Sequence, residues 1–390
     1  MLRVMAAAAT VLEAPPLTEI RPVLVEVSVG RGAEAAVAAA ERLVDANRHE
    51  EAVALLEEFP SEAWRPQKLA LRHLLVLSWV EMVRGRLERA GELLWQADAL
   101  ARSPHFDASE RAEVLYRQGC LALRGARVAE ASSLFTRAIE TNDRSANPSR
   151  TIQAHAHEWR ARCHVLRRDW AAARRDVERS LDAADAVGDP QLRAHGLFQA
   201  SIVAERERQW LLARCYAEEA LEVYAAHGNL LSAARTLNNL GCLEFLLGNV
   251  ETAERRLCEA ARIAADAGSD ADVAQASSSL AQVYLRTDRP GEARDRALAA
   301  EELLEGRTDF LDELGNVQLV LANTFAAEGD REGCEAWLDR AEESFAELGS
   351  SSHLAAAWTA RGDVARAHGD ADAAADLYRR AVEALQDFHF

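Results

Sequence analysis

A small residue recurs every 38 to 42 residues along almost the whole chain. The nine positions in this register are Ala52, Ala90, Ala131, Ala173, Ala213, Ala253, Ala293, Cys334 and Ala374. So regular a period, in a polar and helix-favouring sequence, is typical of stacked helix pairs and not of one globular core. The chain is therefore predicted to be all-α, an α-solenoid in which each helical hairpin buries its apolar face against its neighbours.

Two further small residues accompany most members of the register. One lies twelve residues earlier, as Gly241 does before Ala253, and one lies seven residues later, as Ala260 does. Small residues seven apart share a helix face, so a neighbouring helix can approach to the short end of the ~8–10 Å range. Pairs of glycine or polar residues such as Gly248-Asn249 separate the two helices. The first residue of the pair ends one helix and the second begins the next.

The best-formed unit resembles the tetratricopeptide repeat family. Its matching positions are Leu237, Leu240, Gly241, Gly248, Ala253 and Ala260. The resemblance covers residues 33–390 and implies a right-handed superhelix of about nine hairpins. The unit is longer than the standard 34 residues. In this it is similar to kinesin light chain, to the sensor domain of the maltose-regulon activator and to the Rap family, which implies a role in binding peptides, proteins or small effectors.

Residues 1–32 precede the array and are predicted to be an extension that is partly extended or disordered. Within it, residues 21–30 alternate in hydrophobicity like a strand. A lone strand is not stable in water. This segment is expected to pack on the first helices, to remain disordered, or to add to a strand of another chain.

Composition excludes several classes of function. The net charge of −18 disfavours nucleic acid and anionic membranes as partners. No apolar run approaches the length of a membrane span. Six cysteines without a Cys-x-x-Cys pair favour a reducing compartment. A cytoplasmic protein without a membrane segment is therefore expected.

The sequence also lacks the patterns of an enzyme or a metalloprotein. A phosphate-binding loop and a Gly-x-Gly-x-x-Gly turn are both missing. His155 and His157 are two residues apart on a helix and point in different directions, so they cannot share a metal ion. We therefore predict no catalytic residue, no metal and no cofactor.

The family resemblance implies that the first helix of each repeat lines a concave groove. The ligand-binding positions carried over from the family pattern are Tyr116, Arg117, His155, Trp159, Arg162, His195, Gln199, Arg235, Asn238, Asn239, Gln275, Ser279 and Asn316. Trp79 takes a groove position in the second repeat, as Trp159 does in the fourth. The alternative for both tryptophans is packing between helices, which is the usual role of aromatic residues in such arrays.

Two chemical patterns occur within this set. Gln199, Asn239 and Ser279 take equivalent places in successive repeats, and such a ladder can bond the backbone of an extended peptide. The alternative is that these side chains face water or cap a neighbour. Arg162 belongs to an arginine-rich stretch between Arg144 and Arg179, and together with Arg117 one repeat earlier it can bind a carboxylate or phosphate. Pairing of these arginines with acidic neighbours is the alternative.

The leading functional hypothesis is a cytoplasmic adaptor or scaffold that binds a protein or peptide segment, acidic or with a free carboxylate. The alternative is a ligand- or peptide-responsive sensor of a bacterial signalling or transcription system. A homodimer is also expected, because an uncovered apolar end of a solenoid favours self-association.

Overall fold

A computed structural model describes residues 32–306 and 310–386, so the predicted extension lies outside the described residues except for Gly32. Within the described chain, eighteen α-helices pair into nine hairpins, which confirms the predicted all-α solenoid. The hairpins are α2 (Ala33–Asp45) with α3 (His49–Glu57), α4 (Gln67–Val83) with α5 (Leu87–Ala101), α6 (Ala108–Arg124) with α7 (Val128–Asp143), α8 (Arg150–Leu166) with α9 (Trp170–Val187), α10 (Pro190–Arg206) with α11 (Trp210–Ala226), α12 (Leu230–Leu246) with α13 (Val250–Asp266), α14 (Asp270–Arg286) with α15 (Pro290–Leu304), α16 (Leu311–Ala327) with α17 (Arg331–Leu348), and α18 (Ser351–Ala367) with α19 (Ala371–Gln386). A short 3₁₀ turn, η1 (Ser61–Trp64), precedes α4.

The small residues of the register take one structural position. Each is the fourth residue of the second helix of its hairpin, and each is at most 3 % exposed. The small residues of the first helices allow close contact with large side chains of the second. A Cβ atom added at Gly241 would lie 2.6 Å from Leu257, and one added at Gly362 would lie 2.7 Å from Tyr378. These contacts explain why the repeat requires a small residue at this place.

The turn between the two helices of every hairpin contains one left-handed residue, five positions before the register residue. Four of these residues are glycines, which adopt a positive φ without steric cost. The other five carry side chains and have φ values between 57° and 61°. The nine positions are Asn47, Gly85, Ala126, Arg168, Arg208, Gly248, Asp288, Gly329 and Gly369.

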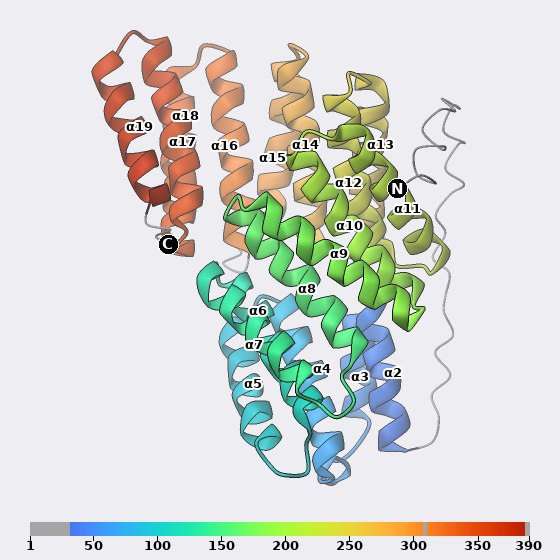
Figure 1. The fold of residues 1–390 in the computed structure, drawn as a ribbon. Coiled ribbons are helices and arrows are strands. Elements are labelled where there is room, and N and C mark those ends of the chain that lie inside the picture. Colours follow the sequence, from blue (N-terminus) through green and yellow to red (C-terminus); the bar gives the residue numbers. More distant parts are fainter. Residues whose placement is uncertain (1–31, 307–309, 387–390) are drawn as a thin grey trace.

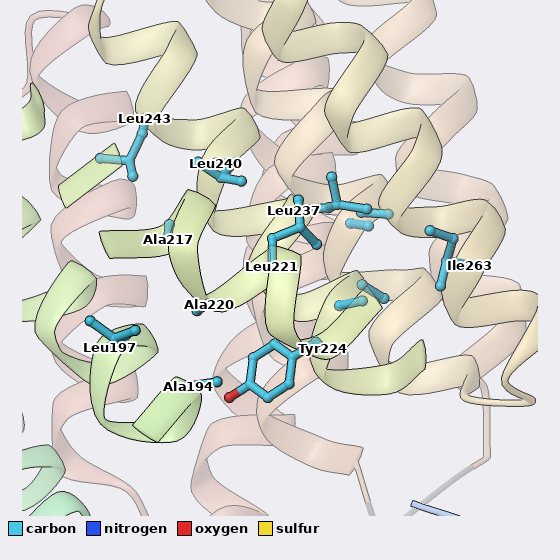
Figure 2. Close-up of a cluster of buried hydrophobic side chains, with 14 of the residues drawn as sticks. Ala194, Leu197, Ala217, Ala220, Leu221, Tyr224, Leu237, Leu240, Leu243 and Ile263 are labelled. Carbon is cyan, nitrogen blue, oxygen red and sulfur yellow. The ribbon is translucent and has the colours of Figure 1, made fainter. Parts of the chain in front are cut away.

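The hydrophobic core is divided into clusters along the array. The largest surrounds Tyr224, where side chains of α10, α11, α12 and α13 meet (Figure 2). Leu237 and Leu240 of α12 are fully buried in it. Because each cluster joins only neighbouring hairpins, stability is expected to arise repeat by repeat.

The first helices line the inner side of the curve. They pack on one another in successive hairpins, from α2 with α4 through α16 with α18, whereas second helices of the described chain make no comparable contact. The helices from α11 onward stack above the first hairpins, with α8, α9 and α10 crossing between the two parts (Figure 1). We call the surface formed by the first helices the groove.

The first hairpin returns to meet the sixth. The Nδ2 atom of Asn47, in the turn between α2 and α3, donates a hydrogen bond of 2.6 Å to Oδ1 of Asn229, the residue before α12. Asn229 in turn donates to the backbone carbonyl of Asp45 over 3.2 Å. Residues 182 positions apart in sequence are therefore in contact.

No helix in residues 32–306 and 310–386 is long and apolar enough to cross a membrane.

Candidate binding site on the concave groove

Aromatic side chains from three successive first helices form a continuous strip in the groove. Trp79 of α4 meets Trp159 of α8 edge to face, with ring centroids 6.0 Å apart. Tyr116 of α6 lies between them along the array and stacks on His155 of α8 at 5.6 Å, with 15° between the ring planes. The structure therefore brings together the predicted residues of hairpins two, three and four.

Two arginines lie on the faces of these tryptophans. The guanidinium carbon of Arg117 is 4.7 Å from the centroid of Trp79, and that of Arg162 is 4.6 Å from Trp159. The face of an aromatic ring attracts a cation, and a guanidinium group held there has its N–H donors in a fixed plane. Both guanidinium groups are thus held in defined orientations beside the aromatic strip.

Neither arginine is strongly neutralised by the protein. The nearest carboxylate oxygen to Arg117 belongs to Glu113 and is 3.8 Å away. The buried Nε atom of Arg117 has no hydrogen-bond partner among residues 32–306 and 310–386. Within the same residues, Arg162 makes no ion pair and no hydrogen bond through its side chain. Both groups retain donors for an anionic ligand.

Other arginines of the same stretch have structural roles. Both carboxylate oxygens of Asp176 accept bonds of 2.7 Å from Arg160, and His157 Nδ1 lies 2.9 Å from the same carboxylate. Asp176 is only 3 % exposed, between α8 and α9. Arg174 pairs with Glu207 of the next hairpin. Internal pairing therefore accounts for part of the arginine-rich stretch, but not for Arg162, and it does not account for Arg117 of the preceding repeat.

His195 of α10 extends the strip by one repeat. Its ring centroid lies 6.3 Å from that of His155, and its Nδ1 atom is 2.8 Å from the hydroxyl of Tyr224. Burial lowers the pKa of His195 to about 4, so the imidazole is neutral at pH 7. Sequence reasoning missed Tyr224 because this residue belongs to a second helix, α11, outside the groove register.

The two adjacent asparagines of α12 present acceptors without partners. The Oδ1 atoms of Asn238 and Asn239 are buried and unbonded within the described chain. Asn239 Nδ2 donates to Ser201 Oγ over 3.3 Å. Buried polar atoms are rarely left unpaired, so two neighbouring acceptors require an explanation. Gln199, the preceding member of the predicted ladder, is 1 % exposed and so lies beneath the surface of the groove.

The remaining predicted positions lie further along the array. Arg235 is held by Asp272 through two bonds of 2.7 and 3.0 Å, which neutralise its charge. Gln275 and Asn316 are exposed, and Ser279 is half-buried. These residues do not join the ring contacts made by the strip in hairpins two to five.

Some titratable side chains of the groove lie near the ends of helices, outside the groove positions predicted from the repeat. Burial, together with the nearby Arg235, lowers the pKa of His49 to about 4. Burial, reinforced by Asp312, raises the pKa of Glu313 to about 9. The groove therefore desolvates titratable groups from α3 and α16, which only the curvature of the array brings to the same side.

The described residues contain no group of three or more His, Cys, Asp or Glu side chains placed to hold a metal ion.

Comparison with known proteins finds a similar repeat in one part of the chain and a similar fold over most of it. Residues 116–188 match the family model described as tetratricopeptide repeat, and no curated protein matches the sequence. The fold is similar to that of a Rap protein complexed with competence and sporulation factor, with a TM-score of 0.65 and 16 % identity over 91 % of this chain and 98 % of that chain. It is also similar to the apo form of the quorum sensor NprR from B. thuringiensis, with a TM-score of 0.62 and 12 % identity over 90 % and 98 % of the two chains.

A third similar structure is a signal-transduction ATPase with a tetratricopeptide repeat sensor from Pyrococcus horikoshii. Its TM-score is 0.54 and its identity 12 %, over 93 % of this chain and 54 % of that chain. At these identities the likeness concerns the fold, and function has to be argued from the site.

Proposed function

We propose that this array of tetratricopeptide-type hairpins is a non-enzymatic adaptor or scaffold whose groove binds an extended protein or peptide segment. The observation that carries the proposal is the pair of buried, unbonded acceptors on Asn238 and Asn239. Because both residues are only half-buried, rotation of their amides would turn these oxygens toward the groove, where the backbone N–H groups of an extended peptide supply the donors they lack. Binding a peptide would therefore remove the cost of leaving two buried acceptors unpaired.

The arginines on the tryptophan faces define the chemistry of the ligand. Arg117 and Arg162 offer N–H donors without a close carboxylate partner in the protein. An acidic side chain or a free C-terminal carboxylate fits these donors, because guanidinium groups bind carboxylates through paired charge-assisted hydrogen bonds. The aromatic strip beside them provides apolar surface for the neighbouring ligand residues.

Selection from a random-peptide library with free C-termini tests the proposal. Peptides are selected on the wild-type protein and counter-selected on the Asn238→Ala/Asn239→Ala variant, and their affinities are measured by fluorescence anisotropy. Selected peptides should carry a carboxylate anchor and should lose about tenfold or more in affinity for Arg117→Ala/Arg162→Ala.

The matched control is Arg175→Ala, an exposed arginine of second helix α9 on the outer side of the array. This control should bind like wild type. Peptides that bind the wild type, the groove variants and the control equally well would contradict a role for the groove.

A ligand-responsive sensor is the second candidate. The Rap structure contains competence and sporulation factor, and NprR is a quorum sensor, and both have this fold over most of the chain. A sensor would pass the binding event to a second partner. A gel-shift measurement at physiological salt tests one such partner, because a chain of net charge −18 should not retard DNA.

We further propose that the protein acts in the cytoplasm and self-associates through its last hairpin. Val382 and Leu385 of α19 are 52 % and 42 % exposed, which leaves apolar area for a second copy. Light scattering at tens of micromolar tests this: a dimer that Val382→Glu converts to a monomer supports it, and a monomeric wild type contradicts it.

A further inference from the structure

The contact between the first and sixth hairpins is built around one buried amide. Asn229 is fully buried, and each of its side-chain atoms is bonded. Its Oδ1 accepts from Asn47 Nδ2 and, over 3.3 Å, from the backbone N–H of Ser232. Its Nδ2 donates to the Asp45 carbonyl and, over 3.3 Å, to Gln191 Oε1. We call the two bonds that Asn229 makes to Asn47 and Asp45 the closing contact.

The closing contact is not supported by an apolar interface. Helices α2 and α3 pack on each other and on α4, whereas packing of comparable extent does not join them to α10, α11 or α12 in the described chain. Amide hydrogen bonds exchange readily with water, so each contributes little net stability. A polar contact without hydrophobic support can therefore open without unfolding either hairpin.

Closure places groups of the first hairpin opposite the binding strip. The side chain of Asp45 is exposed to solvent but lies inside the curve of the array, where desolvation raises the pKa of its carboxyl. The positive charges of His155 and Arg117 act against that rise. His49, one turn further, is near Arg235 and Arg124. The first hairpin thus faces the groove of hairpins three to six.

From these observations we infer that the first hairpin is a gate across the groove, held shut by the closing contact and opened to admit a ligand. The carboxylate of Asp45 then borders the binding site, where Arg117 attracts it electrostatically without forming an ion pair in the described chain. A closed gate therefore places a negative charge where a ligand carboxylate would bind, and opening the gate removes it. The identity of the ligand rests on the proposed function, whereas the gate itself is a property of the free protein.

The test removes the bond between Asn47 and Asn229, one of the two bonds of the closing contact, without straining the turn. Asn47 has a φ of 58°, so Asn47→Gly deletes the amide and keeps a backbone that glycine adopts freely. The matched control is Arg208→Gly, at the equivalent place of the fifth hairpin, where φ is 60° and no contact between distant hairpins is made by the residue within the described chain. Circular dichroism should show that both variants keep the helix content of the wild type.

Small-angle X-ray scattering of the free proteins is the first readout. Asn47→Gly should increase the radius of gyration and the maximum dimension, whereas Arg208→Gly should match the wild type. Hydrogen–deuterium exchange is the second readout. It should be faster at residues 44–49 and 228–233 in Asn47→Gly alone.

Asn229→Asp provides an independent variant. The carboxylate still accepts from Ser232, which preserves the start of α12, and from Asn47, but it cannot donate to the Asp45 carbonyl. This variant should therefore expand in the same direction as Asn47→Gly, and the double variant Asn47→Gly/Asn229→Asp, which lacks both bonds, should expand most. Unchanged dimensions and unchanged exchange in both single variants would overturn the gate. Both measurements are made on the free protein, so their result does not depend on whether the proposed peptide binding is correct.

Discussion

The ring of Phe135 lies directly against the backbone of Gly119, so that a Cβ atom at this glycine would be 2.5 to 2.9 Å from three ring carbons. Gly119 belongs to first helix α6 and Phe135 to second helix α7 of the same hairpin. Both are completely or almost completely covered. The large residue of one helix therefore occupies the volume that the small residue of the other leaves.

Gly119→Ala should lower the free energy of unfolding by about 1–3 kcal/mol, because the added methyl group overpacks a rigid aromatic contact. Urea denaturation measures the change. Gly91→Ala is the control: this helical glycine has its nearest neighbour at 3.6 Å, so alanine should be neutral or stabilising. The double variant Gly119→Ala/Phe135→Leu should regain part of the loss, and equal losses for the single and double variants would contradict this explanation.

Ala126→Gly should stabilise the protein by about 0.5–1 kcal/mol. Ala126 has a φ of 57°, and a left-handed conformation costs a residue with a Cβ more than it costs glycine. The reverse change, Gly248→Ala, should lower the free energy of unfolding by about 1 kcal/mol. A Cβ at that position meets no atom within 4 Å, so the only cost is that of the left-handed backbone conformation. Thermal denaturation of both variants checks the signs, and a stabilised Gly248→Ala protein would be incompatible with the argument.

Asp176→Asn should destabilise the protein by about 3–5 kcal/mol at pH 7, because it leaves the Arg160 guanidinium without its buried counter-charge. Although burial acts to raise it, bonds from Arg160 and His157 hold the pKa of Asp176 far below its usual range. A carboxyl with a depressed folded-state pKa stabilises the protein above the unfolded pKa of about 3.9 and loses this contribution as pH falls.

Denaturation curves of wild type and Asp176→Asn should therefore differ by a constant amount from pH 7 to about 4 and converge at lower pH. Asp182→Asn is the control on the same helix. Its side chain is exposed, so the expected change is within about 0.5 kcal/mol. A difference that persists undiminished at pH 2 would exclude the carboxylate charge as its source.

His195 should make stability fall as the pH is lowered from about 6.5 to 4. Burial holds its folded-state pKa at about 4, whereas the unfolded imidazole titrates near 6.5. Between these values the unfolded state binds more protons, so stability rises with pH, by up to about 3 kcal/mol over the window.

His195→Gln retains a polar partner for Tyr224 but does not titrate. It should lose less stability than wild type between pH 6.5 and 4, as followed by chemical denaturation at several pH values. Identical pH profiles would show that another group, such as His49, whose pKa is also lowered to about 4, accounts for the dependence.

The fold could be predicted because every repeat carries the same constraint. Positions such as Gly119, Gly241 and Gly362 must be small for two helices to touch, and the sequence displays that requirement nine times. The strip could also be located, since Tyr116 and Trp159 follow from the position of the small residue within the first helix.

The other parts of the site depend on curvature, which no single repeat encodes. Asp45 and His49 come near the groove only because the array bends until its first hairpin meets Asn229. Tyr224 reaches His195 from a second helix. Arg235, predicted as a ligand-binding position, has its charge taken by Asp272, a residue 37 positions later that the register could not associate with it.

The bond between Asn47 and Asn229 also constrains how the gene can change. Solenoids commonly grow or shrink by whole hairpins, because each unit contacts only its neighbours. Here, deletion or duplication of a unit between α4 and α11 would rotate Asn229 away from Asn47 and present a different turn to the first hairpin. Gain and loss of repeats should therefore be tolerated beyond α13 and selected against before α12, so that the two parts of the chain would diverge in length at different rates.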